Sequence, residues 1–258
     1  MVYKYVMIGL IKSMRIPDCL LLVAAGLIGF KYAGMSSDIL TLITLFFVIT
    51  VTMLQNDWRD RRHDISKGKT FASSKPSVFI GWLIFFWVLC IILLVVLFLE
   101  HSYAGILLTA MAIIGAIYSE TRRIPFLPVT LVTLTVASST LLPLAFGVDF
   151  TSVAPLFVAM GLIIFGRETL HDIADIEADK NYKKTIPIIM GDKFARVVAT
   201  IALIIGCGLL FTISPITIIG STFIVWGLTG VRSEIHVVQT RKRVDVGLLL
   251  FAASLILF

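Results

Sequence analysis

Charged residues are scarce in this sequence, and their scarcity excludes a soluble globular protein. Asp, Glu, Lys and Arg make up 15% of the 258 residues, whereas 58% are hydrophobic and the mean hydropathy is +0.99. A typical soluble domain is about 25% charged. A helix needs about 20 apolar residues to cross the roughly 30 Å hydrocarbon layer of a bilayer, and such stretches recur along the whole chain. The sequence therefore predicts an all-α integral membrane protein.

Two features of secreted proteins are missing as well. The three cysteines, Cys19, Cys90 and Cys207, lie singly in apolar stretches, so neither a disulfide framework nor a thiolate metal site has the spacing it needs. We interpret them as packing residues. The stretch 1–15 is interrupted by Lys4 and Lys12 and has no cleavage site after a clean apolar core, so we expect an interfacial helix there rather than a signal peptide.

Nine apolar stretches are long enough to be membrane spans. They are residues 17–33, 38–56, 78–99, 103–119, 127–147, 153–171, 195–213, 215–231 and 244–258. Only Ser214-Pro215 separates the seventh from the eighth, so eight or ten spans remain alternatives. Because no soluble segment is left over, we predict a single polytopic membrane domain over residues 1–258.

Lys and Arg are nearly absent from the connections that follow the odd-numbered spans. The N-terminus and the connections after the even-numbered spans, counted with the span ends that adjoin them, carry 21 of the 22 Lys and Arg, and only Lys31 belongs to the other set. By the positive-inside rule we place the N-terminus and these connections in the cytoplasm, and the C-terminus on the opposite side. Topology and contacts with membrane lipids thus explain the net charge of +6, and we expect no nucleic-acid partner.

Two of the basic connections also contain acidic residues at helical spacing. The two sets are Asn56, Asp60 and Asp64 after the second span, and Asp172, Asp175 and Asp179 after the sixth. At 100° per residue the first set falls within about 80° of one helix face, and the second set also shares a face. Two such faces can oppose each other.

Carboxylates on one helix face repel one another unless a cation lies between them. Oxygen ligands without cysteine suit Mg²⁺ or Ca²⁺, and Mg²⁺ fills its remaining positions with water and phosphate oxygens. The pattern therefore predicts Mg²⁺ bridging a diphosphate. Cationic side chains would bind the remaining phosphate oxygens, and our candidates are Arg15, Lys75, Arg122 and Arg167.

Two other interpretations of the acidic residues stay open at this point. They can be solvated helix ends that balance a basic loop, although the same spacing occurs twice, four spans apart. Alternatively, His63 and His171 each precede an Asp and would suit a histidine–aspartate metal pair. Those Asp neighbours, Asp64 and Asp172, occupy different places in the two sets, which argues against the pair.

The acidic motifs carry a family resemblance. The first reads N-D-x-x-D-x-x-x-D from Asn56 to Asp64, and the second reads D-x-x-D-x-x-x-D from Asp172 to Asp179. Together with nine spans they resemble the UbiA-type intramembrane prenyltransferase superfamily, which also includes some membrane terpene cyclases.

Shorter segments extend this resemblance. Arg15 is similar to an arginine at the start of the family's first span, and Lys75-Pro76 stands where many members have Arg-Pro. Thr185-Ile186-Pro187 followed by Gly191 resembles the family's T-L-P…G segment. Tyr118 to Arg122 resembles Y-x-x-x-K with Arg in place of Lys, and the Gly-Asn that commonly follows is missing.

The segment from Arg167 to Asp179 bears on the subgroup. It looks more like members that make archaeal-type ether lipids, tocopherol or chlorophyll than like members acting on 4-hydroxybenzoate, although Ala178 replaces the usual Gly.

The resemblance implies a Mg²⁺-dependent enzyme of isoprenoid biosynthesis. Such an enzyme ionises a prenyl diphosphate and passes the allylic carbocation to an aromatic or lipid acceptor. The implied fold is about nine transmembrane helices around a dry central cavity, with Asp-rich helix ends at its cytoplasmic mouth. Asp60, Asp175 and Tyr118 would be catalytic, and the six motif residues would hold the metal.

Two alternative functions remain. A membrane terpene cyclase would use the same ionisation and capture the cation internally. A cation transporter would usually place its acids near the bilayer midplane, whereas these lie at the ends of spans. Pro143 could mark a helix break that lines a cavity, or could simply loosen helix packing.

Overall fold

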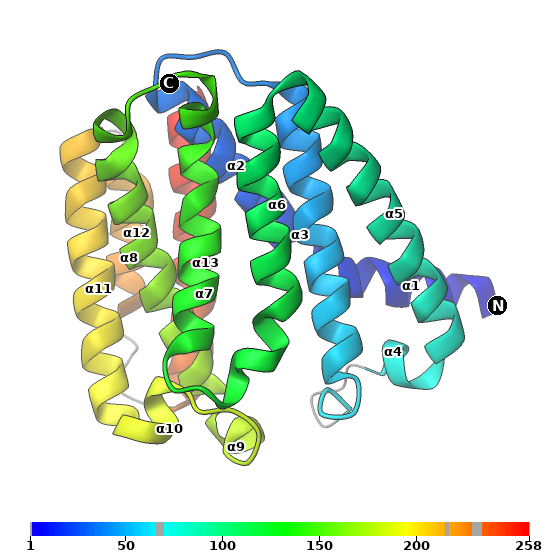
Figure 1. Ribbon diagram of the computed structural model, residues 1–258. Helices are drawn as coiled ribbons and strands as arrows, with labels where there is room; N and C mark the ends of the chain where they lie inside the picture. The colour runs from blue at the N-terminus through cyan, green and yellow to red at the C-terminus, as the bar shows by residue number, and fades with distance from the viewer. Residues whose placement is uncertain (1, 66–69, 215–216, 229–233, 258) are drawn as a thin grey trace. The chain divides into compact units, whose positions relative to one another are not determined.

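The computed structural model describes residues 2–65, 70–214, 217–228 and 234–257, and every regular element within them is helical (Figure 1). The contacts divide the chain into two compact units. Unit 1 consists of Met1–Val23 and Ser37–Glu120, and unit 2 of Ala24–Ser36 and Thr121–Phe258. The helix α2, Ile16–Tyr32, contributes residues to both.

Seven helical segments in the described part of the chain are long and apolar enough to cross a membrane. They are Met7–Tyr32, Ile39–Asp60, Pro76–Glu100, Ser102–Arg123, Leu127–Phe146, Phe150–Ala174 and Asp192–Ile213. They match the first seven predicted spans. The eighth and ninth, 215–231 and 244–258, fall partly on residues outside the described ranges, as does the Ser214-Pro215 junction.

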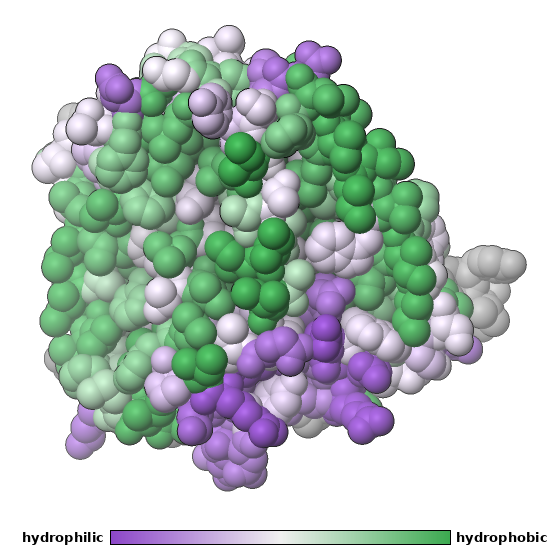
Figure 2. Space-filling model, in the orientation of Figure 1, coloured by the Kyte–Doolittle hydropathy of each residue, from purple (hydrophilic) through white to green (hydrophobic). Residues whose placement is uncertain are grey.

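Unit 1 is built on α3, which packs against α5 and α6 (Figure 1). Its helices are α1 (Val2–Met14), α3 (Ile39–Asp60), α4 (Phe71–Ser74), α5 (Pro76–Glu100) and α6 (Ser102–Ile117). The side chain of Asp38 caps α3 by accepting a 2.7 Å hydrogen bond from the backbone N–H of Thr41, which satisfies one of the unpaired N–H groups at the helix start. Hydrophobic side chains cover the outer side of α5 (Figure 2), as expected for a helix that faces lipid.

Unit 2 is centred on α8, which contacts α7, α11 and α13. Its α-helices are α7 (Leu127–Ser138), α8 (Phe150–Ala174), α9 (Ile176–Asp179), α10 (Ile186–Met190), α11 (Asp192–Ile213), α12 (Ile218–Leu228) and α13 (Glu234–Leu257). Glycine brings α8 and α11 close together: a Cβ on Gly166 would lie 2.7 Å from Leu203 Cγ, and one on Gly206 would lie 2.7 Å from Ile163 Cγ1. Small residues at such contacts let membrane helices approach closely.

Two helical segments differ in extent or geometry from the spans predicted over them. The helix α13, Glu234–Leu257, extends ahead of the span predicted over 244–258, and the residues 234–243 include neither Gly nor Pro to interrupt it. The predicted fifth span changes from α-helix to a 3₁₀ helix, η2, over Ser139–Phe146. Pro143 lies inside η2, where it lacks an N–H and would clash with an α-helical carbonyl four residues earlier.

Two predictions about local structure are confirmed. The stretch near the N-terminus is helical as α1, although its interfacial position stays a prediction. Cys19, Cys90 and Cys207 are buried thiols without disulfides, which agrees with their interpretation as packing residues.

Candidate functional site

The first acidic motif lies at the end of α3 in unit 1. Asn56 and Asp60 belong to the last turns of the helix, and Asp64 follows in a turn whose backbone N–H donates a 2.9 Å hydrogen bond to the carbonyl oxygen of Asp60. Both carboxylates are buried, with 6% of Asp60 and 4% of Asp64 exposed. The predicted helical spacing therefore holds for one turn beyond the end of α3.

Two neighbours tie this motif to the rest of unit 1. Arg15 Nη2 lies 3.0 Å from Asp57 Oδ1, so the arginine expected to bind diphosphate pairs with an acid of the motif that the sequence analysis did not assign. Ser119 Oγ donates a 3.0 Å hydrogen bond to Asn56 Oδ1. The neighbouring Tyr118 begins the 3₁₀ helix η1, Tyr118–Arg123, and is half-buried.

The second acidic motif lies at the end of α8 in unit 2, but it does not form one continuous helix face. The helix ends at Ala174, and Asp175 is its C-cap residue with φ −102° and ψ 7°. Asp179 belongs to the separate short helix α9. The prediction that Asp172, Asp175 and Asp179 share a single helix was therefore wrong, because Asp175 leaves the α conformation between them.

The last acid of this motif has a cationic partner. Asp179 is 0% exposed, and its Oδ2 atom lies 2.9 Å from Lys183 Nζ. Asp172 and Asp175 are half-buried. His171 Nε2 lies 3.7 Å from Asp175 Oδ2, and its Nδ1 atom lies 3.8 Å from Glu168 Oε2. A lysine therefore lies next to Asp179 and a histidine next to Asp175.

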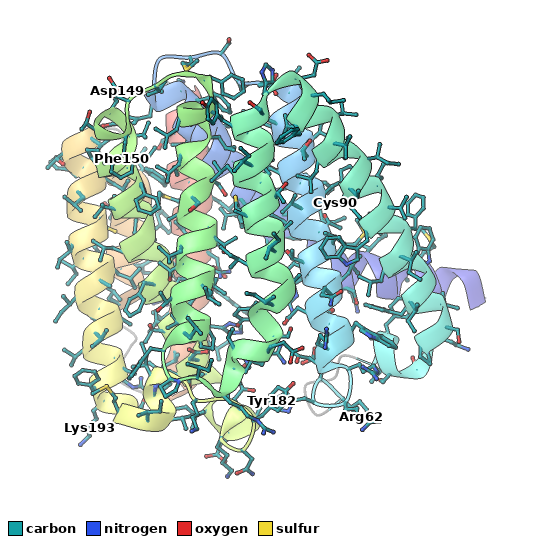
Figure 3. The ribbon with its side chains drawn as sticks, in the orientation of Figure 1. Arg62, Cys90, Asp149, Phe150, Tyr182 and Lys193 are labelled. Atoms are coloured by element: carbon teal, nitrogen blue, oxygen red, sulfur yellow. The ribbon has the colours of Figure 1, made fainter. Side chains whose placement is uncertain are left out.

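Arg122 is the buried cation of unit 2 that the sequence analysis assigned to diphosphate. It is 3% exposed, and its Nη1 atom donates a 2.7 Å hydrogen bond to the phenolic oxygen of Tyr182. Figure 3 labels Tyr182 and Lys193 at one end of unit 2, and Asp149 and Phe150 at the other. Hydrophilic side chains gather around α9, at the same end as Tyr182 (Figure 2).

Arg167, a further predicted diphosphate ligand, lies within a cluster of carboxylates. Its Nε atom donates a 2.6 Å hydrogen bond to Asp245 Oδ1 of α13, and its Nη1 atom donates to Glu168 Oε1. This cluster joins α8 to α13. The remaining predicted cation, Lys75, is exposed immediately before α5.

The donor set of both motifs fits a hard divalent cation, because it consists of oxygen atoms. Among the described residues, no group of three or more His, Cys, Asp and Glu side chains could hold a metal ion by itself. Mg²⁺ commonly takes one or two carboxylates and completes its shell with water and substrate phosphates. The motifs therefore fit a metal that binds together with a phosphorylated substrate better than a closed protein cage.

The sequence alone did not predict a role for several of these residues. Asp57 was visible within the first motif, but its pairing with Arg15 spans 42 positions and depends on how the segments pack. Tyr182 and Lys183 carried no separate signal within a basic loop. Asp245 stood in a predicted span with no indication of its partner.

Comparison with known proteins identifies the family. The model of the UbiA prenyltransferase family matches residues 19–255, so the chain belongs to this family. It is a multi-pass membrane prenyltransferase, as the sequence motifs predicted. A comparison with curated proteins gave no match.

Solved structures support the same fold. A digeranylgeranylglyceryl phosphate synthase is 21% identical with a TM-score of 0.68, covering 98% of this chain and 100% of its own. A UbiA homologue from Aeropyrum pernix K1 is 16% identical with a TM-score of 0.71, covering 94% and 98%. A UbiA homologue from Archaeoglobus fulgidus, bound to GPP and Mg²⁺, is 16% identical with a TM-score of 0.61, covering 97% and 100%.

Proposed function

We propose that this protein transfers a prenyl group from an isoprenoid diphosphate to an aromatic or lipid acceptor within the membrane, with Mg²⁺ as cofactor. The observation that carries the proposal is the pair of acidic motifs, each positioned where a membrane span ends. Acids in such places are costly unless a cation binds them. The chain's membership of the UbiA family gives that cation a substrate, a prenyl diphosphate.

The Mg²⁺ ligands in this proposal are the six motif residues. They are Asn56, Asp60 and Asp64 in unit 1, and Asp172, Asp175 and Asp179 in unit 2. Two structures of a UbiA homologue from Archaeoglobus fulgidus, one bound to GPP and Mg²⁺ and one to DMAPP and Mg²⁺, support Mg²⁺ as the cofactor. When bound, Mg²⁺ would stabilise the negative charge of the departing diphosphate.

The chain's cations would share the task of holding the diphosphate. Arg122 is one candidate because it is buried and its guanidinium donates a hydrogen bond to the phenolic oxygen of Tyr182. Arg15 and Arg167 are each paired with carboxylates, so they would bind phosphate oxygens only by sharing. Lys75 is exposed and therefore suited to first contact with the substrate.

The allylic carbocation needs a dry, apolar surrounding. We propose that Tyr118 stabilises the cation with its ring face. Tyr118 is half-buried and stands four residues before Arg122 in the sequence. The spans supply the apolar cavity in this proposal, and the lipid-soluble prenyl tail enters it from the bilayer.

Orientation follows from charge. We propose nine spans with the N-terminus and the acidic motifs on the cytoplasmic side and the C-terminus opposite, because Lys and Arg concentrate in one set of connections. A single catalytic domain is supported by the family match, which runs through both units. The similarity to a digeranylgeranylglyceryl phosphate synthase favours a lipid acceptor over an aromatic one.

A turnover assay tests the proposal. Purified protein in lipid would be incubated with Mg²⁺, labelled geranyl, farnesyl or geranylgeranyl diphosphate, and acceptors that include prenylated glyceryl phosphates and aromatic acids. We expect a labelled acceptor with the wild type and with Asp149→Asn, a control at the exposed start of α8. We expect at least a hundredfold slower transfer with Asp60→Asn or Asp175→Asn, as for removal of other charge-stabilising groups, and loss of transfer when EDTA removes Mg²⁺.

Other outcomes are equally informative. Labelled hydrocarbons formed without any acceptor would replace the transferase by a terpene cyclase. Wild-type activity in Asp60→Asn and Asp175→Asn would refute the metal assignment. An absence of diphosphate release with every substrate would refute the proposed function.

A further inference from the structure

The loop that follows the second acidic motif contacts Arg122 through one side chain in two ways. The phenolic oxygen of Tyr182 accepts a 2.7 Å hydrogen bond from Arg122 Nη1. The Tyr182 ring also lies below the guanidinium, with 5.3 Å from Cζ to the ring centroid. Together, the ring face and the hydroxyl restrict both the position and the tilt of the guanidinium plane.

A backbone contact from the same loop holds the other end of Arg122. The backbone N–H of Lys184 donates a 2.9 Å hydrogen bond to the carbonyl oxygen of Arg122. Arg122 is therefore attached to residues 182–184 at its main chain and at its guanidinium. Because the side chain is 3% exposed, few other rotamers remain open to it.

The acidic motif in turn sets the position of Tyr182. The carbonyl oxygen of Asp179 accepts backbone hydrogen bonds from Tyr182 at 2.8 Å and from Lys183 at 2.9 Å. The Lys183 ammonium also lies 2.9 Å from the carboxylate of Asp179, which is fully buried. A movement of Asp179 would thus move the turn that carries Tyr182.

A phenol is a suitable partner for a cation that must bind an anion. It accepts a hydrogen bond from a guanidinium without adding a negative charge of its own. The planar guanidinium binds phosphate with two parallel N–H groups, so its orientation decides how well it binds. A residue that fixes this orientation lowers the entropy lost on binding.

We propose that Tyr182 is a positioning residue that orients Arg122 for the diphosphate and couples that orientation to the second acidic motif. The proposal rests on the proposed function, since it takes the diphosphate as the ligand of Arg122. Tyr182 itself acts through Arg122. Its contribution should therefore disappear when Arg122 is removed.

A double-mutant cycle on pyrophosphate binding tests this inference. The binding of inorganic pyrophosphate with Mg²⁺ would be measured by titration calorimetry on purified wild type, Tyr182→Phe, Arg122→Gln and the double variant. Tyr182→Phe keeps the ring and removes the hydroxyl that accepts the hydrogen bond from Arg122, so we expect about tenfold weaker binding. We expect the double variant to bind no more weakly than Arg122→Gln alone.

Two controls and a kinetic measurement separate positioning from a general structural role. Asn181→Ala changes an exposed residue of the same loop, and Tyr103→Phe removes the hydroxyl of an exposed tyrosine at the start of α6; both should bind like the wild type. In turnover assays Tyr182→Phe should raise KM for the prenyl diphosphate about tenfold with a smaller change in kcat.

A failure of this inference can be told apart from a failure of the proposed function. Either of two results would overturn the role of Tyr182 and leave the proposed function intact. In the first, the wild type binds pyrophosphate and Tyr182→Phe binds it equally well. In the second, Tyr182→Phe weakens binding by the same factor whether or not Arg122 is present. A wild type that neither binds pyrophosphate with Mg²⁺ nor releases diphosphate would overturn both.

Discussion

Arg15 Nη2 lies 3.0 Å from Asp57 Oδ1, and this ion pair joins the start of α2 to the first acidic motif. Arg15 has φ +48°, in the left-handed region that costs a non-glycine residue about 1 kcal/mol or more. The pair compensates a backbone conformation that the sequence disfavours. In the proposed function, Arg15 would therefore reach the diphosphate from a position set by a carboxylate.

Replacing Asp57 with Asn should therefore affect folding more than chemistry. We expect a loss of about 1–2 kcal/mol in unfolding free energy, because the half-buried Arg15 loses its charged partner and remains partly hydrated. Transfer activity should fall less than tenfold, against at least a hundredfold in Asp60→Asn. Thermal unfolding and initial rates on the same preparations would check this. A loss of activity equal to that of Asp60→Asn would make Asp57 a member of the metal site.

Lys183 places its ammonium 2.9 Å from Asp179 Oδ2, where a bound cation would also be drawn. In Lys183→Met we expect lower thermal stability without Mg²⁺ and a larger rise in Tm on adding Mg²⁺, because the lysine no longer competes for the carboxylate. The extra rise should be several degrees and should be absent in Lys183→Met with Asp179→Asn. An identical Mg²⁺ response in the wild type and Lys183→Met would show that the metal does not reach Asp179.

Variants in the cluster of Arg167, Glu168 and Asp245 can separate two roles of Arg167, joining α8 to α13 and binding diphosphate. If Arg167 only joins α8 to α13, then Asp245→Asn and Arg167→Gln should destabilise the protein similarly, by about 1–2 kcal/mol. Because we propose that Arg167 also shares in binding diphosphate, Arg167→Gln alone should raise KM for the prenyl diphosphate, by about threefold to tenfold. Equal KM values in the two variants would leave Arg167 a purely structural residue.

Gly206 lies where α11 meets α8, and a Cβ there would be 2.7 Å from Ile163 Cγ1 and 3.0 Å from the Ala159 carbonyl oxygen. Gly206→Val should thus destabilise unit 2 by about 1–3 kcal/mol through overpacking. Gly208→Val on the same helix is the matched control, because nothing lies within 4 Å of a Cβ at that position. Thermal unfolding of the two variants in one detergent would compare them. Equal Tm values would contradict the close packing of α8 and α11.

The spans and the motif positions were predictable because they depend on local signals. Apolar stretches of membrane length and acids at i+4 spacing are visible in the sequence alone, and α3, α5, α8 and α11 appear close to their expected ranges. The ion pairs were not predictable. Arg167 and Asp245 are 78 positions apart, so their meeting depends on how α8 and α13 pack.

The break at Asp175 was missed for a different reason. The residues around it, Ile173, Ala174 and Ile176, contain neither proline nor glycine, so nothing in the sequence signalled a helix end. Its backbone N–H still donates the α-helical hydrogen bond to the carbonyl oxygen of His171, but it also lies against that of Ile173, and its ψ of 7° departs from α geometry. Such a change is set by tertiary contacts rather than by helix propensity.

The 3₁₀ geometry of η2 alters how far its span reaches. A 3₁₀ helix rises about 2.0 Å per residue against about 1.5 Å in an α-helix. The 12 residues of α7 and the 8 of η2 therefore extend about 18 Å and about 16 Å by the same rises, or about 34 Å together. An α-helix of the same length would extend only about 30 Å. A substitution at Pro143 that restored α geometry would shorten the span by about 4 Å and draw the turn at Gly147 toward the hydrocarbon layer.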